Sequence, residues 1–66
     1  MPDRRVADLF IEPGVLVRHP TQDDWGLGQV QTVVGEKITV NFEHAGKQTI
    51  DGRQVQLVYV GDDPRQ

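Results

Sequence analysis

Residues 25–50 carry runs of alternating or β-branched residues separated by turn-forming residues, which predicts three consecutive β-strands. A Gly-x-Gly bend, Gly26 to Gly28, leads into the first run. A glycine followed by one further residue matches a type II′ hairpin turn at the first break. The expected strands and the turns between them are, in order, 29–34, Gly35-Glu36, 37–43, His44-Ala45-Gly46 and 47–50. So compact a meander leaves room only for a small curled sheet.

The flanking segments add two strands, 15–19 and 55–60. Pro20 ends the first of these, and the polar residues 21–24 form a loop with strong turn formers. Residues 51–54 fit one tight 3₁₀ turn before the last strand. The expected organisation is an N-terminal arm at 1–13, a barrel at 14–60 and a polar tail at 61–66. Within the arm, the segment 6–11 fits either one helical turn or an extended strand-like arm.

Composition and length support an all-β domain. The 66 residues make a single domain, and ten Val, three Ile and four Thr outnumber two Ala and four Leu. No cysteine is present to form a disulfide or a thiolate metal site. Five short strands, with a long loop after the first and a tight turn before the fifth, predict a five-stranded SH3/Tudor-like barrel. An OB-fold is the alternative, although its longer strands fit poorly in so short a chain.

Period-two alternation predicts which side chains face inward, and the glycines mark the bends. In the strand 37–43, Ile38, Val40 and Phe42 share one side, which we assign to the core. The full expected core is Val15, Val17, Val30, Ile38, Val40, Phe42, Ile50, Val55 and Leu57. The expected bend residues are Gly26, Gly28, Gly35 and Gly46. At Gly26 and Gly28 we expect either a positive φ or a neighbour too close for a Cβ.

No residue cluster specifies a chemistry. The chain lacks Ser and Cys, and a barrel this small is filled by its own side chains, so an enzyme is not expected and no catalytic residue is assigned. His19, Asp23 and Asp24 are close in sequence but lack a metal-site spacing, so no metal site is assigned. The Gly-x-Gly lacks the third glycine and the helix of a dinucleotide site, so no cofactor is expected.

Charge and hydropathy limit the partners. The net charge is −3 and the seven basic residues are scattered, so nucleic-acid binding is expected to be weak or absent. No apolar run has the length of a membrane span, and the start Met-Pro-Asp-Arg-Arg precedes no apolar signal segment. The sequence therefore predicts a cytoplasmic protein with no membrane partner.

Two resemblances follow from these motifs. The stretches Asp24-Trp25-Gly26-Leu27-Gly28-Gln29-Val30 and Ile38 to Lys47 resemble a family of small bacterial proteins known as a domain of unknown function, over Gly14–Val60. A wider pattern is similar to the C-terminal Tudor-like domain of UvrD/PcrA-type DNA helicases. It is more loosely similar to the RNA polymerase-interaction domains of CarD-type regulators and of the transcription-repair coupling factor. The matching positions are Gly14, Val17, His19, Trp25, Gly26, Gly28, Val30, Val40, Phe42, Gly46 and Lys47.

In those similar families the module contacts RNA polymerase, in CarD-type regulators by adding a strand to a polymerase sheet. The resemblance therefore implies a protein-binding module whose partner is RNA polymerase or associated transcription and repair machinery. We expect the protein to be a monomer. A nucleic-acid-binding small barrel is the alternative. We expect binding through an unpaired edge strand, supported by Trp25 and the outward residues Thr39 and Asn41, with Lys47 or Arg18 contributing charge at the rim. Two interpretations of Trp25 stay open, namely an interface anchor and a member of the core.

Overall fold

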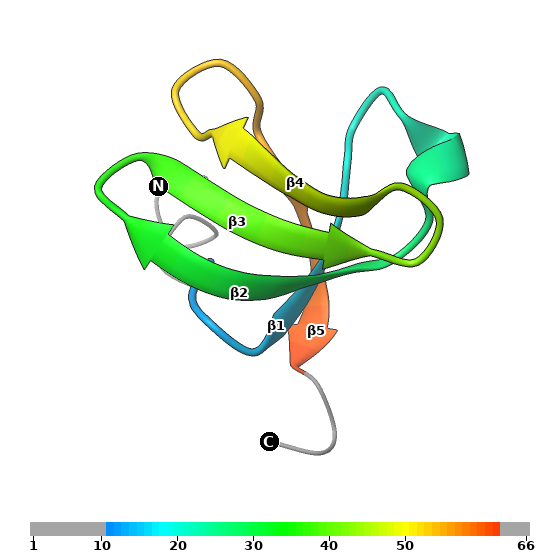
Figure 1. Ribbon diagram of the computed structural model, residues 1–66, viewed down its shortest axis with the longest axis horizontal. Coiled ribbons are helices and arrows are strands. Elements are labelled where there is room, and N and C mark those ends of the chain that lie inside the picture. The colour runs from blue at the N-terminus through cyan, green and yellow to red at the C-terminus, as the bar shows by residue number, and fades with distance from the viewer. Residues whose placement is uncertain (1–10, 63–66) are drawn as a thin grey trace, which may run out of the picture.

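A single five-stranded antiparallel sheet makes up most of the domain. The computed structural model describes residues 11–62. Its elements in chain order are β1 (Val15–Arg18), the 3₁₀ helix η1 (Asp23–Trp25), β2 (Gly28–Val34), β3 (Lys37–Phe42), β4 (Gly46–Asp51) and β5 (Val58–Asp62). Figure 1 shows β2, β3 and β4 side by side in one curled layer, with β1 and β5 running across its far side. The all-β prediction is confirmed.

The order of the strands leaves the sheet open. Across the sheet the order is β4-β3-β2-β1-β5, and every pairing is antiparallel. Pairing between β4 and β5 would close a barrel, but no such pairing joins them within residues 11–62. The expected closed barrel is therefore not confirmed, and β4 and β5 are the two edges of the described sheet.

The hairpin turns form where the sequence predicted them. Gly35 has φ +59° while Glu36 is not in the positive region, which is the combination that a II′ turn requires. Gly46 has φ +76°, so it supplies the left-handed residue that ends the second turn. A Cβ at either glycine would meet nothing within 4 Å, so backbone conformation alone explains the choice of glycine.

The core is the inner face of this sheet. Eight of the nine expected core residues are buried, with side chains from β1 to β4 and from the segment before β5: Val15, Val17, Val30, Ile38, Val40, Phe42, Ile50 and Leu57. Val55, the ninth, is half-buried and packs against this cluster. Ile11 packs against the cluster in the same way.

Strand boundaries differ from the prediction by one residue in β1 to β4 and by more in β5. β5 begins at Val58 instead of residue 55 and includes Gly61 and Asp62, which were expected in the tail. The tight turn at 51–54 forms, because both Gln54 N and Val55 N donate to Asp51 O at 3.0 Å. Residues 55–57 then lead the chain from the β4 edge toward β1. Val55 and Leu57 pack against the core, but the backbone of this segment is not paired with a strand. The 3₁₀ helix itself lies at Asp23–Trp25, where only a polar loop was expected.

Some predictions lie outside the described residues. The helical or extended form of the arm concerns mainly residues 6–10, and the end of the polar tail concerns residues 63–66. Within residues 11–62, no helix has the length and apolar character needed to cross a bilayer.

Val40 tests the core assignment, because its side chain is fully buried at 0% exposure in the central region of the sheet. Replacing Val40 by Ala should lower the free energy of unfolding by about 1–3 kcal/mol, through lost burial and a residual cavity. Val34→Ala is the matched control, because Val34 is 72% exposed. Urea or thermal denaturation followed by circular dichroism measures both. Equal midpoints for the two variants would contradict the core assignment.

Candidate protein-binding surfaces

Thr39 and Asn41 lie on the outer face of β3 and away from any edge. β3 is hydrogen-bonded to β2 on one side and to β4 on the other. Its backbone therefore has no free side to which another strand could be added. Both residues face away from the core, and whether they support binding at an edge strand elsewhere in the sheet stays a prediction.

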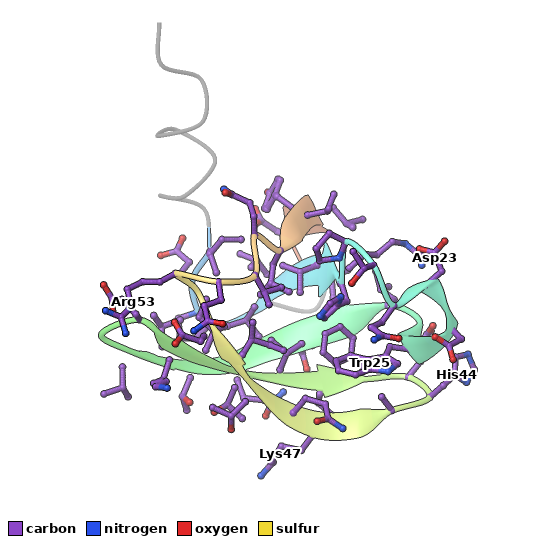
Figure 2. The ribbon with its side chains drawn as sticks, turned by 90° about the horizontal axis from the view of Figure 1, so that it is seen from above. Asp23, Trp25, His44, Lys47 and Arg53 are labelled. Atoms are coloured by element: carbon purple, nitrogen blue, oxygen red, sulfur yellow. The ribbon has the colours of Figure 1, made fainter. Side chains whose placement is uncertain are left out.

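Lys47 and Arg18 are exposed but belong to different parts of the sheet. Lys47 lies on the edge strand β4, opposite Asn41, and its side chain points away from the sheet in Figure 2. Arg18 lies on β1, opposite Val58 of the other edge strand. Since β4 and β5 are at opposite ends of the strand order, these two residues do not flank one edge.

Trp25 packs on the inner side of the sheet. Its ring makes edge-on contacts with His19, at 4.7 Å between ring centroids, and with Phe42, at 5.1 Å. It is half-buried against the core cluster, and Figure 2 shows it between the two layers of the ribbon. Trp25 therefore lies on the opposite face from Thr39 and Asn41, and the five expected binding residues do not form one surface. Whether Trp25 also contacts a partner stays a prediction.

A set of backbone hydrogen bonds holds Trp25 in place. His44 N donates to Trp25 O at 3.0 Å, and Glu43 N donates to Leu27 O at 2.8 Å. The Glu43 carboxylate accepts a hydrogen bond from Leu27 N at 3.0 Å. Two of these bonds join main chain to main chain, so the loop before β2 is attached directly to the turn after β3.

The two glycines around Leu27 allow this close approach. Gly26 has φ +82°, and a Cβ there would lie 2.7 Å from His44 Cδ2. A Cβ on Gly28 would lie 2.5 Å from Val40 Cγ1 and 2.7 Å from Phe42 Cδ1. Real Cβ atoms do not approach other heavy atoms so closely, so both positions need glycine for packing, and Gly26 also needs it for its backbone conformation. Both glycines therefore meet the expectation of a positive φ or of a neighbour too close for a Cβ.

His19 has a structural environment. The residue is 9% exposed, its Nδ1 accepts the Thr21 N–H at 3.2 Å, and its ring contacts the ring of Trp25. No group of three or more His, Cys, Asp or Glu side chains that could hold a metal ion occurs within residues 11–62. His44 and Asp23 lie together at one end of the molecule in Figure 2, but on the surface.

One hollow in the described surface has mainly apolar walls. It has a volume of about 310 Å³ and lies between the β2–β3 hairpin and the segment 52–57. Its walls include Ile11, Val33, Ile38, Val55 and Leu57. The charged groups at its rim, Glu36 and Arg53, form an ion pair at 2.8 Å.

Charges occupy the β4 edge. Asp51, at the end of β4, lies 3.7 Å from Lys37 Nζ and 3.7 Å from Arg53 Nε. The backbone N–H of Arg53 donates to Asp51 Oδ1 at 2.9 Å. This hydrogen bond is the main reason that the pKa of Asp51 lies below its usual value of 3.8, with smaller contributions from the Lys37 and Arg53 charges against the opposing effect of burial. With Lys47 at its other end, β4 carries the charged residues that discourage strand addition.

The β5 edge is apolar. Val58 and Val60 are each 49% exposed, and no charged residue occurs in β5 before Asp62. A β-bulge interrupts the pairing with β1, since Leu16 pairs with Gly61 and Val17 with Tyr59, so that Val60 has no counterpart. The Tyr59 hydroxyl donates to Asp62 Oδ1 at 3.2 Å. Burial, this hydrogen bond and the nearby Asp62 and Glu12 charges raise the pKa of Tyr59.

The basic residues do not form a patch. Of the four within residues 11–62, Lys37 and Arg53 are in ion pairs with acidic residues. Arg18 and Lys47 are the other two, and they lie on strands separated by β2 and β3. A nucleic-acid surface would bring several of these charges onto one face.

Comparison with known protein families gives a match that covers most residues of the sheet. The family described as "Protein of unknown function (DUF3553)" matches residues 11–60. The chain belongs to this family. The matched region of DUF3553 begins at Ile11, which packs on the core, and ends within β5. No curated protein and no solved structure matched the chain.

Trp25→Ala should destabilise the DUF3553 domain. The substitution removes two aromatic contacts, worth about 0.5–1.5 kcal/mol each, and part of the core's cover. We therefore expect the free energy of unfolding to fall by about 2 kcal/mol, measured by urea denaturation with circular dichroism. A double-mutant cycle with His19→Ala should show a coupling of about 0.5–1.5 kcal/mol. Additive effects in the cycle would contradict the contact, and an unchanged midpoint would contradict the packing role.

Asp51 should make stability depend on acid pH. The pKa of Asp51 is lower in the folded protein than in the unfolded chain, so the ionised carboxylate stabilises the fold above about pH 4 to 5. This stabilisation is lost as the pH falls through the pKa of the folded state, which lies below 3.8. Asp51→Asn should lower the melting temperature at pH 7, and the difference from wild type should shrink on acidification toward about pH 2. Asp24→Asn, at an exposed carboxylate of η1, is the control. The same acid dependence in wild type and Asp51→Asn would contradict the role assigned to Asp51.

Proposed function

We propose that this DUF3553 protein is a non-enzymatic protein-interaction module that accepts an extended strand of its partner along β5. The observation that carries the proposal is the difference between the two sheet edges. β4 bears Lys47, Asp51 and the ion pairs around Asp51, whereas β5 presents Val58 and Val60 to solvent. Natural sheets protect unused edges with charges, so the apolar edge is the one suited to a partner.

Two features of β5 suit it to the addition of a strand, namely its unpaired edge and its exposed valines. No strand pairs with its second side within residues 11–62, so backbone groups there can bond to an added chain. Two exposed β-branched side chains beside that edge give an added strand apolar neighbours on one face. Backbone pairing then supplies affinity, and contacts with alternate side chains supply selectivity.

The first partner to test is RNA polymerase, or transcription and repair machinery associated with it. The support is the similarity in sequence to Tudor-like and CarD-type modules, together with the order β4-β3-β2-β1-β5, in which β5 returns to pair with β1. That order is compatible with a small SH3-like barrel whose last contact is left open. We expect the module to act as a monomer in the cytoplasm. The nucleic-acid alternative has less support, because the basic residues are dispersed or paired.

Val60→Lys tests the docking edge. A lysine at this exposed position adds a charge of the kind that protects natural edges and should leave the fold intact. The tagged protein is used to capture proteins from a bacterial lysate, and the captured proteins are quantified by mass spectrometry. We expect RNA polymerase subunits to be retained by wild type and reduced at least five-fold by Val60→Lys.

Val34→Lys is the matched control, because it places the same charge on a valine that is 72% exposed and lies in the β2–β3 hairpin. It should capture as much polymerase as wild type. Equal capture by all three proteins would contradict the β5 edge. Absence of polymerase subunits from the wild-type sample would contradict the partner.

A further inference from the structure

The outer face beside β5 carries a positive charge that has no partner in the described part of the chain. Arg18 is the register partner of Val58, so the two side chains point to the same face of the sheet. Arg18 is exposed, and no carboxylate lies within ion-pair distance of it among residues 11–62. Its guanidinium is therefore available to a group lying against Val58.

The opposite face of β5 carries negative charge at the other end of the strand. Tyr59 packs against the core, so it faces inward, and its hydroxyl donates to Asp62 Oδ1. The bulge at Val60 explains how residues three apart can share this face.

An added strand would lie within reach of both charges. Neighbouring strands are about 4.8 Å apart, so a residue opposite Val58 on the added strand would have its Cα about 9.6 Å from that of Arg18. An extended arginine and a glutamate can bridge this distance across Val58. The Asp62 carboxylate lies at the other end of the same strand, on the inward-facing side.

Resting on the proposed function, we infer that the strand accepted by β5 has a defined charge pattern. It carries an acidic side chain opposite Val58 on the outer face and a basic side chain beside Asp62 on the inner face. Between them it has apolar or β-branched residues that lie against Val60. The partner is thus an extended protein segment with one charge of each sign, and the two charges face opposite sides of the sheet.

The two proposed ion pairs, between the added strand and Arg18 and between the added strand and Asp62, are partly exposed, so each has a modest effect on affinity. Exposed ion pairs change binding by about 2- to 5-fold and weaken with added salt. They select among strands that the backbone edge would otherwise accept equally, because like charges in the same places disfavour binding.

A displayed library of random seven-residue peptides tests this pattern whatever the identity of the partner. The full chain is immobilised, peptides are selected on it, and the enriched sequences are read. For wild type we expect peptides in which Val, Ile, Thr or aromatic residues alternate, as in a β-strand. Asp or Glu should be enriched at a position on one face of that strand, and Lys or Arg at a position on the opposite face.

Charge reversal on the protein should reverse the selection. Arg18→Glu should replace the acidic preference by a basic one, and Asp62→Lys should replace the basic preference by an acidic one. Lys47→Glu is the matched control, because Lys47 is an exposed cation on the β4 edge, and it should leave the selected sequences unchanged. Circular dichroism melting of each variant confirms folding, and fluorescence polarisation of one selected peptide should show about a 2- to 5-fold loss with Arg18→Glu.

The outcomes separate the two proposals. Strand-like peptides that lack a charge preference, or whose preference is unchanged by Arg18→Glu, overturn the charge pattern and leave strand addition in place. Selection of the same peptides by wild type and Val60→Lys overturns docking at β5 and with it both proposals. Failure of wild type to enrich any strand-like peptide also overturns both.

Discussion

The close approach of the backbone at Gly26 and Gly28 to the end of β3 is the constraint on which the rest of this structure depends. A side chain at Gly28 would collide with Val40 and Phe42, so glycine allows the start of β2 to lie close to these two core residues of β3. At Gly26 the chain passes beside Glu43 and His44, and three hydrogen bonds join the two segments. Trp25 is carried by the same segment onto Phe42, which covers this end of the core.

The open side of the sheet leaves the described domain with two unpaired edges. A closed barrel would have no free edge, whereas the described sheet has two, and they differ in chemistry. At β4 the ion pairs of Asp51 stabilise the turn into residues 52–55 and place charge at the edge. At β5, within the described residues, neither ion pairs nor lysines are present, so the same architecture leaves one edge protected and the other available.

Alternation in the sequence predicts the face of a residue but says little about the neighbours of its strand. The inward assignment of Val30, Val40 and Phe42 was correct, because period two is a local property. The outward side of Thr39 and Asn41 also follows from alternation, but which strand is an edge does not, because strand order is set by long-range pairing. The late start of β5 has the same cause, since residues 55–57 keep the alternation but cross between strands. Trp25 contacts Phe42 from a distant loop, and no local pattern encodes that contact.

The segment from Gln54 to Val60 shows why β5 differs from the other strands. Inward positions stay apolar throughout, with Val55 and Tyr59 half-buried and Leu57 buried. Outward positions change from glutamine at 54 and 56 to valine at 58 and 60, and the change coincides with the first residue of the strand. Burial in the folded monomer does not explain these outward valines, because both are about half exposed. Contact with an added strand would explain them, since β-branched side chains gain most from a neighbour on a pleated surface.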